Sequence, residues 1–117
     1  MTTEFEPTNT LQWHPAAPVS AFPADGGACV RIGDRQIAVF NFSQTGAWYA
    51  CQNQCPHKMQ MILSRGLTGD QQGEPKVACP YHKKTFSLCT GQNLNGEAYQ
   101  IDTYPVRVDG GMVYIGL

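Results

Sequence analysis

Residues 79–86 read CPYHKKTF, and residues 53–58 read NQCPHK. In each stretch a Cys is followed by a Pro, and a His comes shortly after, in a C-x-H spacing in residues 53–58 and a C-x-x-H spacing in residues 79–86. Each stretch therefore supplies one soft thiolate and one imidazole, and four such groups match the ligand set of a zinc ion or an iron–sulfur cluster. These candidate ligands are Cys55, His57, Cys79 and His82.

The order of the ligands separates the two kinds of metal centre. A Rieske [2Fe-2S] centre binds one iron through two Cys and the other through two His. Two opposed loops, each with one Cys and one His, achieve this by presenting Cys to one iron and His to the other. Zinc sites of the Cys2His2 type instead pair like ligands, as C-x-x-C with H-x3-H. The alternating order favours the iron–sulfur centre, with cluster-binding loops at about 53–60 and 78–86.

The other cysteines and the remaining histidine have ordinary structural interpretations. We expect small buried core residues at three of the cysteines, Cys29, Cys51 and Cys89. We expect His14 to lie on the surface or to have its hydrogen bonds satisfied within the protein. Cys51 is the closest competitor as a ligand, because it lies four residues before Cys55. Its place in a predicted strand favours burial instead.

The segments between turn signals are short and predict strands rather than helices. Residues 28–32 and 36–40 flank a Gly-Asp-Arg turn and predict a hairpin, and residues 112–115 pair back onto 104–108 across Asp-Gly-Gly. Further strands are expected at 47–51, 75–78 and 85–88. Residues 58–74, with three glycines, suggest a loop, and the Pro-rich N-terminal third is expected to wrap the surface. The pattern predicts an all-β fold, a small sandwich or barrel of short antiparallel strands.

Composition limits the domain number and the class of partner. The length of 117 residues predicts a single domain spanning 1–117. A net charge of -1 argues against a dedicated nucleic-acid binder. No apolar run approaches the ~18 residues of a membrane helix, and the N-terminus MTTEFEPTNT lacks the pattern of a secretory signal. We therefore expect a cytoplasmic protein with reduced thiols and no membrane association.

The two motifs resemble those of Rieske proteins, and other stretches narrow the resemblance. The F-x-L-x-T-G turn after the second motif and the YPVRV-DG-V ending are similar to general Rieske elements. LSRGL between the motifs and Lys-Lys-Thr-Phe after His82 resemble the small subunit of assimilatory NAD(P)H-dependent nitrite reductase. The resemblance covers about residues 29–115.

The resemblance implies a function in electron transfer. It places a Rieske [2Fe-2S] cluster on Cys55, His57, Cys79 and His82, and it implies an oxidoreductase subunit with no catalytic residue of its own. The implied partner is a large subunit carrying flavin and siroheme, which reduces nitrite to ammonium, so the small subunit alone should show no turnover. The alternatives are a stand-alone Rieske ferredoxin serving an oxygenase, and a zinc module without redox activity.

The resemblance also implies a low reduction potential. High-potential Rieske proteins have a disulfide between the ligand loops and two hydroxyl groups that donate hydrogen bonds to sulfur. The corresponding positions here are Gln60, Tyr81, Lys84 and Phe86, so neither feature is present. Lys83 and Lys84 are then interpreted as a solvated docking surface, with two ordinary surface charges as the equal alternative.

Overall fold

The computed structural model describes residues 12–56, 59–81 and 83–117, and these residues form mostly short strands with brief 3-10 helices, labelled η. The elements are β1 (Trp13–Pro18), η3 (Val19–Ala21), β2 (Gly27–Ile32), β3 (Arg35–Phe42), β4 (Ala47–Gln52), β5 (Gln54–Cys55), β6 (Gln60–Met61), η4 (Leu63–Arg65), β7 (Leu67–Gln71), β8 (Glu74–Ala78), β9 (Thr85–Ser87), β10 (Thr103–Tyr104), β11 (Val106–Asp109) and β12 (Met112–Gly116).

The central sheet has the order β10-β4-β3-β2, and all its neighbours are antiparallel. Successive side chains of a strand point to opposite sides of the sheet. Since four consecutive residues of β3 are buried, this strand is buried on both faces. Ile37 and Val39 contribute to one hydrophobic cluster, whereas Ala38 and Phe40 contribute to the other. The sequence IAVF thus reads as a continuous apolar run rather than an alternating one.

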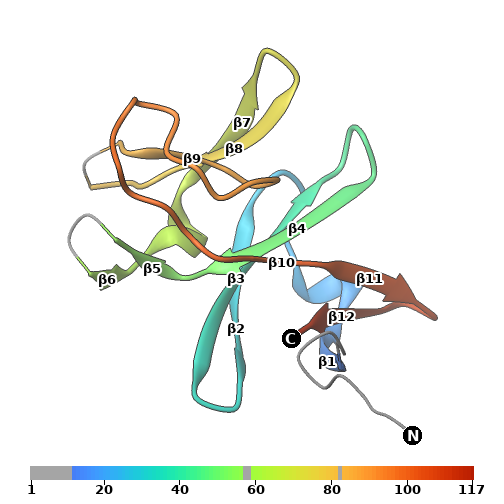
Figure 1. Cartoon of the computed structure of the whole chain (residues 1–117). Helices are drawn as coiled ribbons and strands as arrows, with labels where there is room; N and C mark the ends of the chain where they lie inside the picture. Colours follow the sequence, from blue (N-terminus) through green and yellow to red (C-terminus); the bar gives the residue numbers. More distant parts are fainter. Residues whose placement is uncertain (1–11, 57–58, 82) are drawn as a thin grey trace, which may run out of the picture.

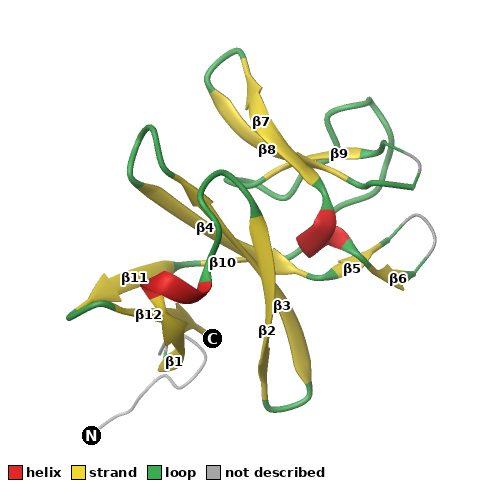
Figure 2. Ribbon diagram, turned by 180° about the vertical axis from the view of Figure 1, so that it is seen from behind, coloured by secondary structure: helices red, strands yellow, loops and turns green. Residues whose placement is uncertain are grey.

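Each face of the central sheet is covered by a different smaller sheet. The β1-β12-β11 sheet supplies Val113 and Ile115 to the core on one side. The β7-β8-β9 sheet supplies Val77 and Phe86 to the core on the other side. Figure 1 shows the two sheets on opposite sides of β3 and β4, and Figure 2 shows the same arrangement from behind. The predicted all-β architecture is confirmed.

Two segments differ from the sequence-based expectation. The N-terminal segment includes β1, which pairs antiparallel with β12, and its prolines are tolerated because β1 is an edge strand with an irregular register between Pro15 and Ala17. The expected loop at 58–74 includes β7, which forms a hairpin with β8. The tight turn between β7 and β8 can form because Gln72 and Gly73 both adopt positive φ, 54° and 87°.

The β5–β6 hairpin and the connection from β8 to β9 lie at the same end of the molecule. In Figure 1 both are on the left, away from the β1-β12-β11 sheet, and in Figure 2 both are on the right. The fold therefore brings the two motif-bearing regions to one side. Among the described residues, no helix is long and apolar enough to cross a membrane.

Candidate metal centre

The two candidate cysteine ligands are buried in the same part of the core. Cys55 ends β5 and is 1% exposed, and Cys79 directly follows β8 and is 2% exposed. Both belong to the hydrophobic cluster that contains Leu63, Val77 and Phe86. The structure thus brings together two thiols that are 24 positions apart in the sequence, as the difference between 79 and 55 shows.

The backbone has the same hydrogen-bond pattern after each cysteine. The carbonyl of Cys55 accepts a hydrogen bond from the N–H of Met59 at 2.7 Å, and the carbonyl of Cys79 accepts one from Lys83 at 2.8 Å. Met59 and Lys83 both have φ of 56°. The fifth residue after each cysteine also pairs with that cysteine. Gln60 lies opposite Cys55 in the β5–β6 ladder, and Lys84 accepts a hydrogen bond at its carbonyl from the Cys79 N–H. The two regions are therefore equivalent turns despite their different Cys-to-His spacing.

The two histidines lie outside the described residues, as does Lys58. Within the described ranges there is no group of three or more His, Cys, Asp or Glu side chains arranged to hold a metal ion. The four-ligand set at Cys55, His57, Cys79 and His82 accordingly stays a prediction, of which the structure describes the two cysteines.

Asn53 anchors the first loop and was not singled out by the sequence analysis. It is 2% exposed, and its carbonyl accepts hydrogen bonds from Ile62 and Leu63, both at 2.9 Å. Its side chain accepts a hydrogen bond from the Ser64 N–H at 2.7 Å and donates one to Gln36 Oε1 at 3.2 Å, and its N–H donates to the Gln36 carbonyl. Asn53 thereby joins β3, η4 and the start of the first loop. Its position two residues before Cys55 was the available signal.

The second loop is held by the segment that follows β9. The Thr85 N–H donates to Asn95 Oδ1 at 2.8 Å, and the Thr85 carbonyl accepts from the Leu94 N–H at 2.7 Å. Thr85 Oγ1 also donates to the Lys83 carbonyl at 3.3 Å. Residues after the F-x-L-x-T-G turn thus fold back over the loop and fix its exit.

Gly91 closes that turn at a point where only glycine fits. Its φ is 80°, and a Cβ there would lie 2.0 Å from the carbonyl oxygen of Ile101. The Gly91 N–H donates to the Ser87 carbonyl, and the Ile101 N–H donates to the Gly91 carbonyl. The close approach ties β9 to the chain leading into β10.

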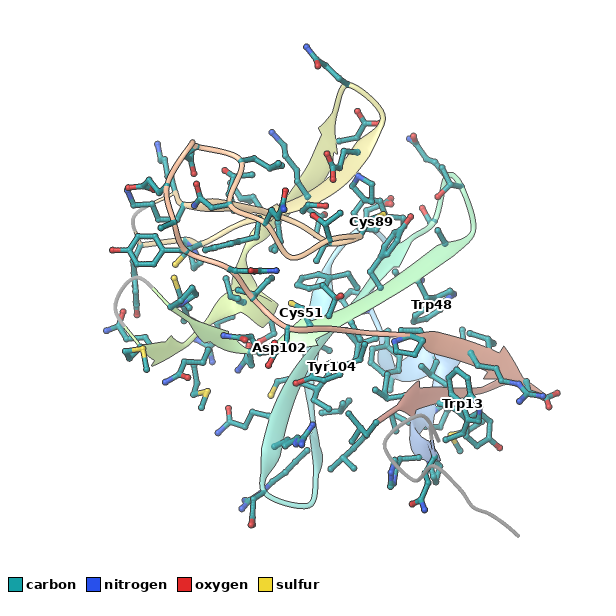
Figure 3. The ribbon with its side chains drawn as sticks, in the orientation of Figure 1. Trp13, Trp48, Cys51, Cys89, Asp102 and Tyr104 are labelled. Atoms are coloured by element: carbon teal, nitrogen blue, oxygen red, sulfur yellow. The ribbon has the colours of Figure 1, made fainter. Side chains whose placement is uncertain are left out.

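The remaining cysteines divide between core and surface. Cys51 is fully buried, as expected, and burial raises the pKa of its thiol. The expectation of core positions for Cys29 and Cys89 was wrong, because both are exposed. Both lie at places where the chain meets solvent, on the edge strand β2 and in the turn after β9. Figure 3 labels both residues, with Cys51 near the centre of the molecule and Cys89 above it in this view.

Burial alone does not distinguish Cys51 from the candidate ligands, since all three cysteines share one cluster. Their backbone settings do. Cys51 lies within β4, paired with Ala38 on one side and Thr103 on the other. Cys55 and Cys79 instead begin turns. A thiol at the start of a turn can face a metal ion, whereas a thiol in a central strand packs between its neighbours.

The side chains flanking the two loops are largely solvent-exposed. Met59 is 64% exposed, Met61 50% and Tyr81 60%, and Lys83 is also exposed. Met59 and Met61 therefore do not bury themselves over the core. We call these four residues the loop face.

The two lysines after the second motif have different environments. Lys84 Nζ forms an ion pair with Glu97 Oε2 at 2.7 Å, and its side chain is 22% exposed. For Lys84 the structure therefore favours the alternative interpretation, a surface charge that is paired within the domain. Within the described part of the chain, the Lys83 side chain has no ion pair.

One surface cavity lies away from the two motifs. It has a volume of about 460 Å³ and is lined mainly by the β3–β4 turn and β7, with no residue from either motif.

The residues present fit a thiolate-bound iron centre. Two buried thiols begin equivalent turns in one cluster, and cysteine binds a metal ion as its thiolate. Such a pair of turns on an all-β scaffold is compatible with the Rieske-type site that the sequence predicts.

The comparisons with known proteins agree with this class. The family described as "Rieske-like [2Fe-2S] domain" matches residues 12–116, and the chain belongs to this family. The expected fold and [2Fe-2S] cofactor are thereby confirmed.

Individual relatives confirm the narrower resemblance. The chain is 39% identical over 118 residues to "Nitrite reductase [NAD(P)H]" of Emericella nidulans, covering 93% of this chain but 10% of that protein. It is 32% identical over 104 residues to "Nitrite reductase (NADH) small subunit" of Escherichia coli K12, covering 89% of this chain and 96% of that one. The NMR structure of the E. coli protein NirD has a TM-score of 0.82 and 30% identity, covering 92% and 98% of the two chains.

The chain thus spans about a tenth of the length of the Emericella relative and nearly all of the E. coli small subunit. It is also 29% identical over 109 residues to "Naphthalene 1,2-dioxygenase system, ferredoxin component" of Pseudomonas aeruginosa.

Proposed function

We propose that this chain is the Rieske-type small subunit of an NAD(P)H-dependent nitrite reductase. In this proposal residues 1–117 form one Rieske domain, Cys55 and Cys79 bind one iron, and His57 and His82 bind the other. The observation that carries the proposal is the pair of equivalent turns that begin with buried cysteines, in a chain similar to nitrite reductase small subunits over most of its length.

The described residues suit a relay for single electrons. A [2Fe-2S] centre accepts and passes one electron when it is bound. Burial of Cys55 and Cys79 keeps water away from their thiol groups. The hydrogen bonds of Asn53 and Thr85 fix the positions of the two loops. Exposed side chains at Met59 and Tyr81 surround the loops on the solvent side, where a redox partner would approach.

The complete reaction belongs to a partner in this proposal. A large subunit with flavin and siroheme would take electrons from NAD(P)H and reduce nitrite to ammonium, and this chain would bind it. The Emericella relative supports this arrangement, because there the similar segment is a tenth of one long nitrite reductase. Use of NAD(P)H as the reductant also suits a cytoplasmic location.

A stand-alone ferredoxin for an oxygenase is the second candidate. The likeness to the naphthalene dioxygenase ferredoxin component supports it, at lower identity than the likeness to the E. coli nitrite reductase small subunit. The two candidates differ in their partner, so identification of the partner decides between them.

The test is association with the nitrite reductase large subunit of the same organism. The two proteins are purified separately, mixed and analysed by size-exclusion chromatography and isothermal titration calorimetry. We expect a stable complex, and no nitrite-dependent NAD(P)H oxidation by this chain alone. Failure to bind the large subunit, together with electron donation to an aromatic-ring oxygenase, would favour the ferredoxin.

A further inference from the structure

Met59 and Lys83 share an unfavourable backbone conformation at equivalent places. Both have φ of 56°, in the left-handed region that glycine adopts freely and that other L-residues adopt at a cost. Each is the fourth residue after a candidate cysteine ligand and donates its N–H to that cysteine's carbonyl. Glycine would make the same hydrogen bonds without the strain, so the turn itself does not require these side chains.

Contacts inside the domain do not account for the two side chains. Met59 is 64% exposed, and among the described residues Lys83 has only backbone hydrogen bonds, from its N–H to Cys79 and from Thr85 Oγ1 to its carbonyl. Lys84 provides the contrast, because its ammonium group is paired with Glu97. The two side chains are therefore available to a partner, and their place beside the candidate ligands distinguishes them from Gln72, which is also exposed with positive φ.

We propose that Met59 and Lys83 are partner-contact residues, whose side chains bind the nitrite reductase large subunit. The partner surface presents an apolar area against Met59 and a carboxylate against Lys83. This proposal rests on the proposed function and specifies the residues and the chemistry of the docking.

Among the described residues, the neighbouring side chains support an apolar contact with one positive charge. Met61 and Tyr81, the other members of the loop face, are 50% and 60% exposed. Methionine adapts its shape to a partner, and tyrosine offers an apolar ring with a polar tip, which makes both common in interfaces. Lys83 adds a cation that lacks an acidic neighbour in the described structure, so an acidic group on the partner completes the pair.

The charge also argues for a different protein over a second copy of this chain. In a two-fold dimer centred on the loop face, the same cation would meet itself across the axis. A partner with a carboxylate at this place avoids that repulsion and is guided toward the loops during encounter.

The experiment uses glycine substitutions, which remove each side chain and relieve the backbone strain together. The variants are Met59→Gly, Lys83→Gly and the double variant, each in the full chain with its cluster. Gln72→Gly is the matched control, because Gln72 is also exposed with positive φ, at the β7–β8 turn. All variants are expected to keep the wild-type EPR spectrum and to resist urea at least as well as the wild type.

Binding of the large subunit, measured by calorimetry, should separate the variants. Met59→Gly and Lys83→Gly should each bind about tenfold more weakly, whereas Gln72→Gly should bind like the wild type. Lys83→Arg should restore most of the binding. The loss with Lys83→Gly should shrink at high salt, and the loss with Met59→Gly should not.

The possible outcomes are distinguishable. If the wild type fails to bind the large subunit, the proposed function is wrong and the docking proposal with it. If the wild type binds and all glycine variants bind equally well, only the docking proposal is overturned. Loss of the cluster signal in Met59→Gly or Lys83→Gly would assign these side chains to the stability of the loops and would also overturn it.

Discussion

The first ligand loop should depend on the buried side chain of Asn53. In the variant Asn53→Ala, the backbone hydrogen bonds to Gln36, Ile62 and Leu63 can persist, because they involve only main-chain atoms of residue 53. The side-chain acceptor for the Ser64 N–H and the donor to Gln36 Oε1 are both lost. The variant therefore tests the anchoring of the loop separately from its backbone path.

The expected size follows mainly from these two lost hydrogen bonds, because the third, from Asn53 Nδ2 to Cys29 Sγ at 3.6 Å, is a weak contact to sulfur. The Ser64 N–H is buried, and a buried donor left without a partner costs about 1–3 kcal/mol. The partly buried bond to Gln36 contributes about 0.5–1.5 kcal/mol. Together these amount to roughly 2–4 kcal/mol, a large share of the ~5–15 kcal/mol that stabilises an ordinary domain.

The assay combines stability with retention of the cluster. Urea unfolding followed by far-ultraviolet circular dichroism gives the free energy of unfolding, and the visible absorbance gives the rate of cluster loss at a fixed urea concentration. Asn53→Ala should lower the free energy of unfolding and increase the rate of cluster loss. Asn41→Ala is the control, since Asn41 lies on β3 and its side chain makes no hydrogen bond in the described structure.

The control should change the free energy of unfolding by less than about 0.5 kcal/mol. An Asn53→Ala variant within the same margin of the wild type, with an unchanged rate of cluster loss, would refute the anchoring role.

Three further predictions follow from the site. Cys51→Ala should keep the Rieske EPR spectrum and lower the free energy of unfolding by about 1 kcal/mol, because Cys51 is a buried strand residue; a lost spectrum would make it a ligand. Gly91→Ala should destabilise the domain by at least about 2 kcal/mol in urea unfolding, since the new Cβ meets the Ile101 carbonyl oxygen, and a neutral effect would contradict the close approach. The midpoint potential, measured by voltammetry, should be below about -50 mV, because the hydroxyl donors of high-potential centres are replaced at Lys84 and Phe86. Each missing donor is worth on the order of 60–130 mV, and the ion pair of Lys84 offsets its charge; a midpoint above about +100 mV would contradict this reasoning.

The sequence predicted the parts of the fold that depend on local pattern. The β2–β3 and β11–β12 hairpins follow from apolar residues flanking glycine turns, and both form with the expected partners. Burial of Cys51 followed from its place in an apolar strand. The cysteines of the two motifs share one buried cluster, as two opposed loops require.

The features that were missed depend on contacts between distant segments. Strand β1 exists because the edge of β12 is available to it, which its Pro-rich sequence does not reveal. Exposure of Cys29 depends on β2 being an edge strand, and the charge of Lys84 is paired because Glu97 folds back toward it. The role of Asn53 likewise depends on η4, eleven residues away at Ser64. Such relations follow from topology and not from short-range pattern.

Anchoring of the loops matters only if they hold the cluster through the four predicted ligands. EPR spectroscopy of the purified, dithionite-reduced protein tests this most directly, with His57→Ala, His82→Ala and Cys51→Ala measured beside the wild type. The account predicts a Rieske signal with an average g value clearly below that of the free electron, lost in both histidine variants and kept in Cys51→Ala. A stoichiometric zinc content without such a signal, or a signal that survives both histidine substitutions, would contradict it.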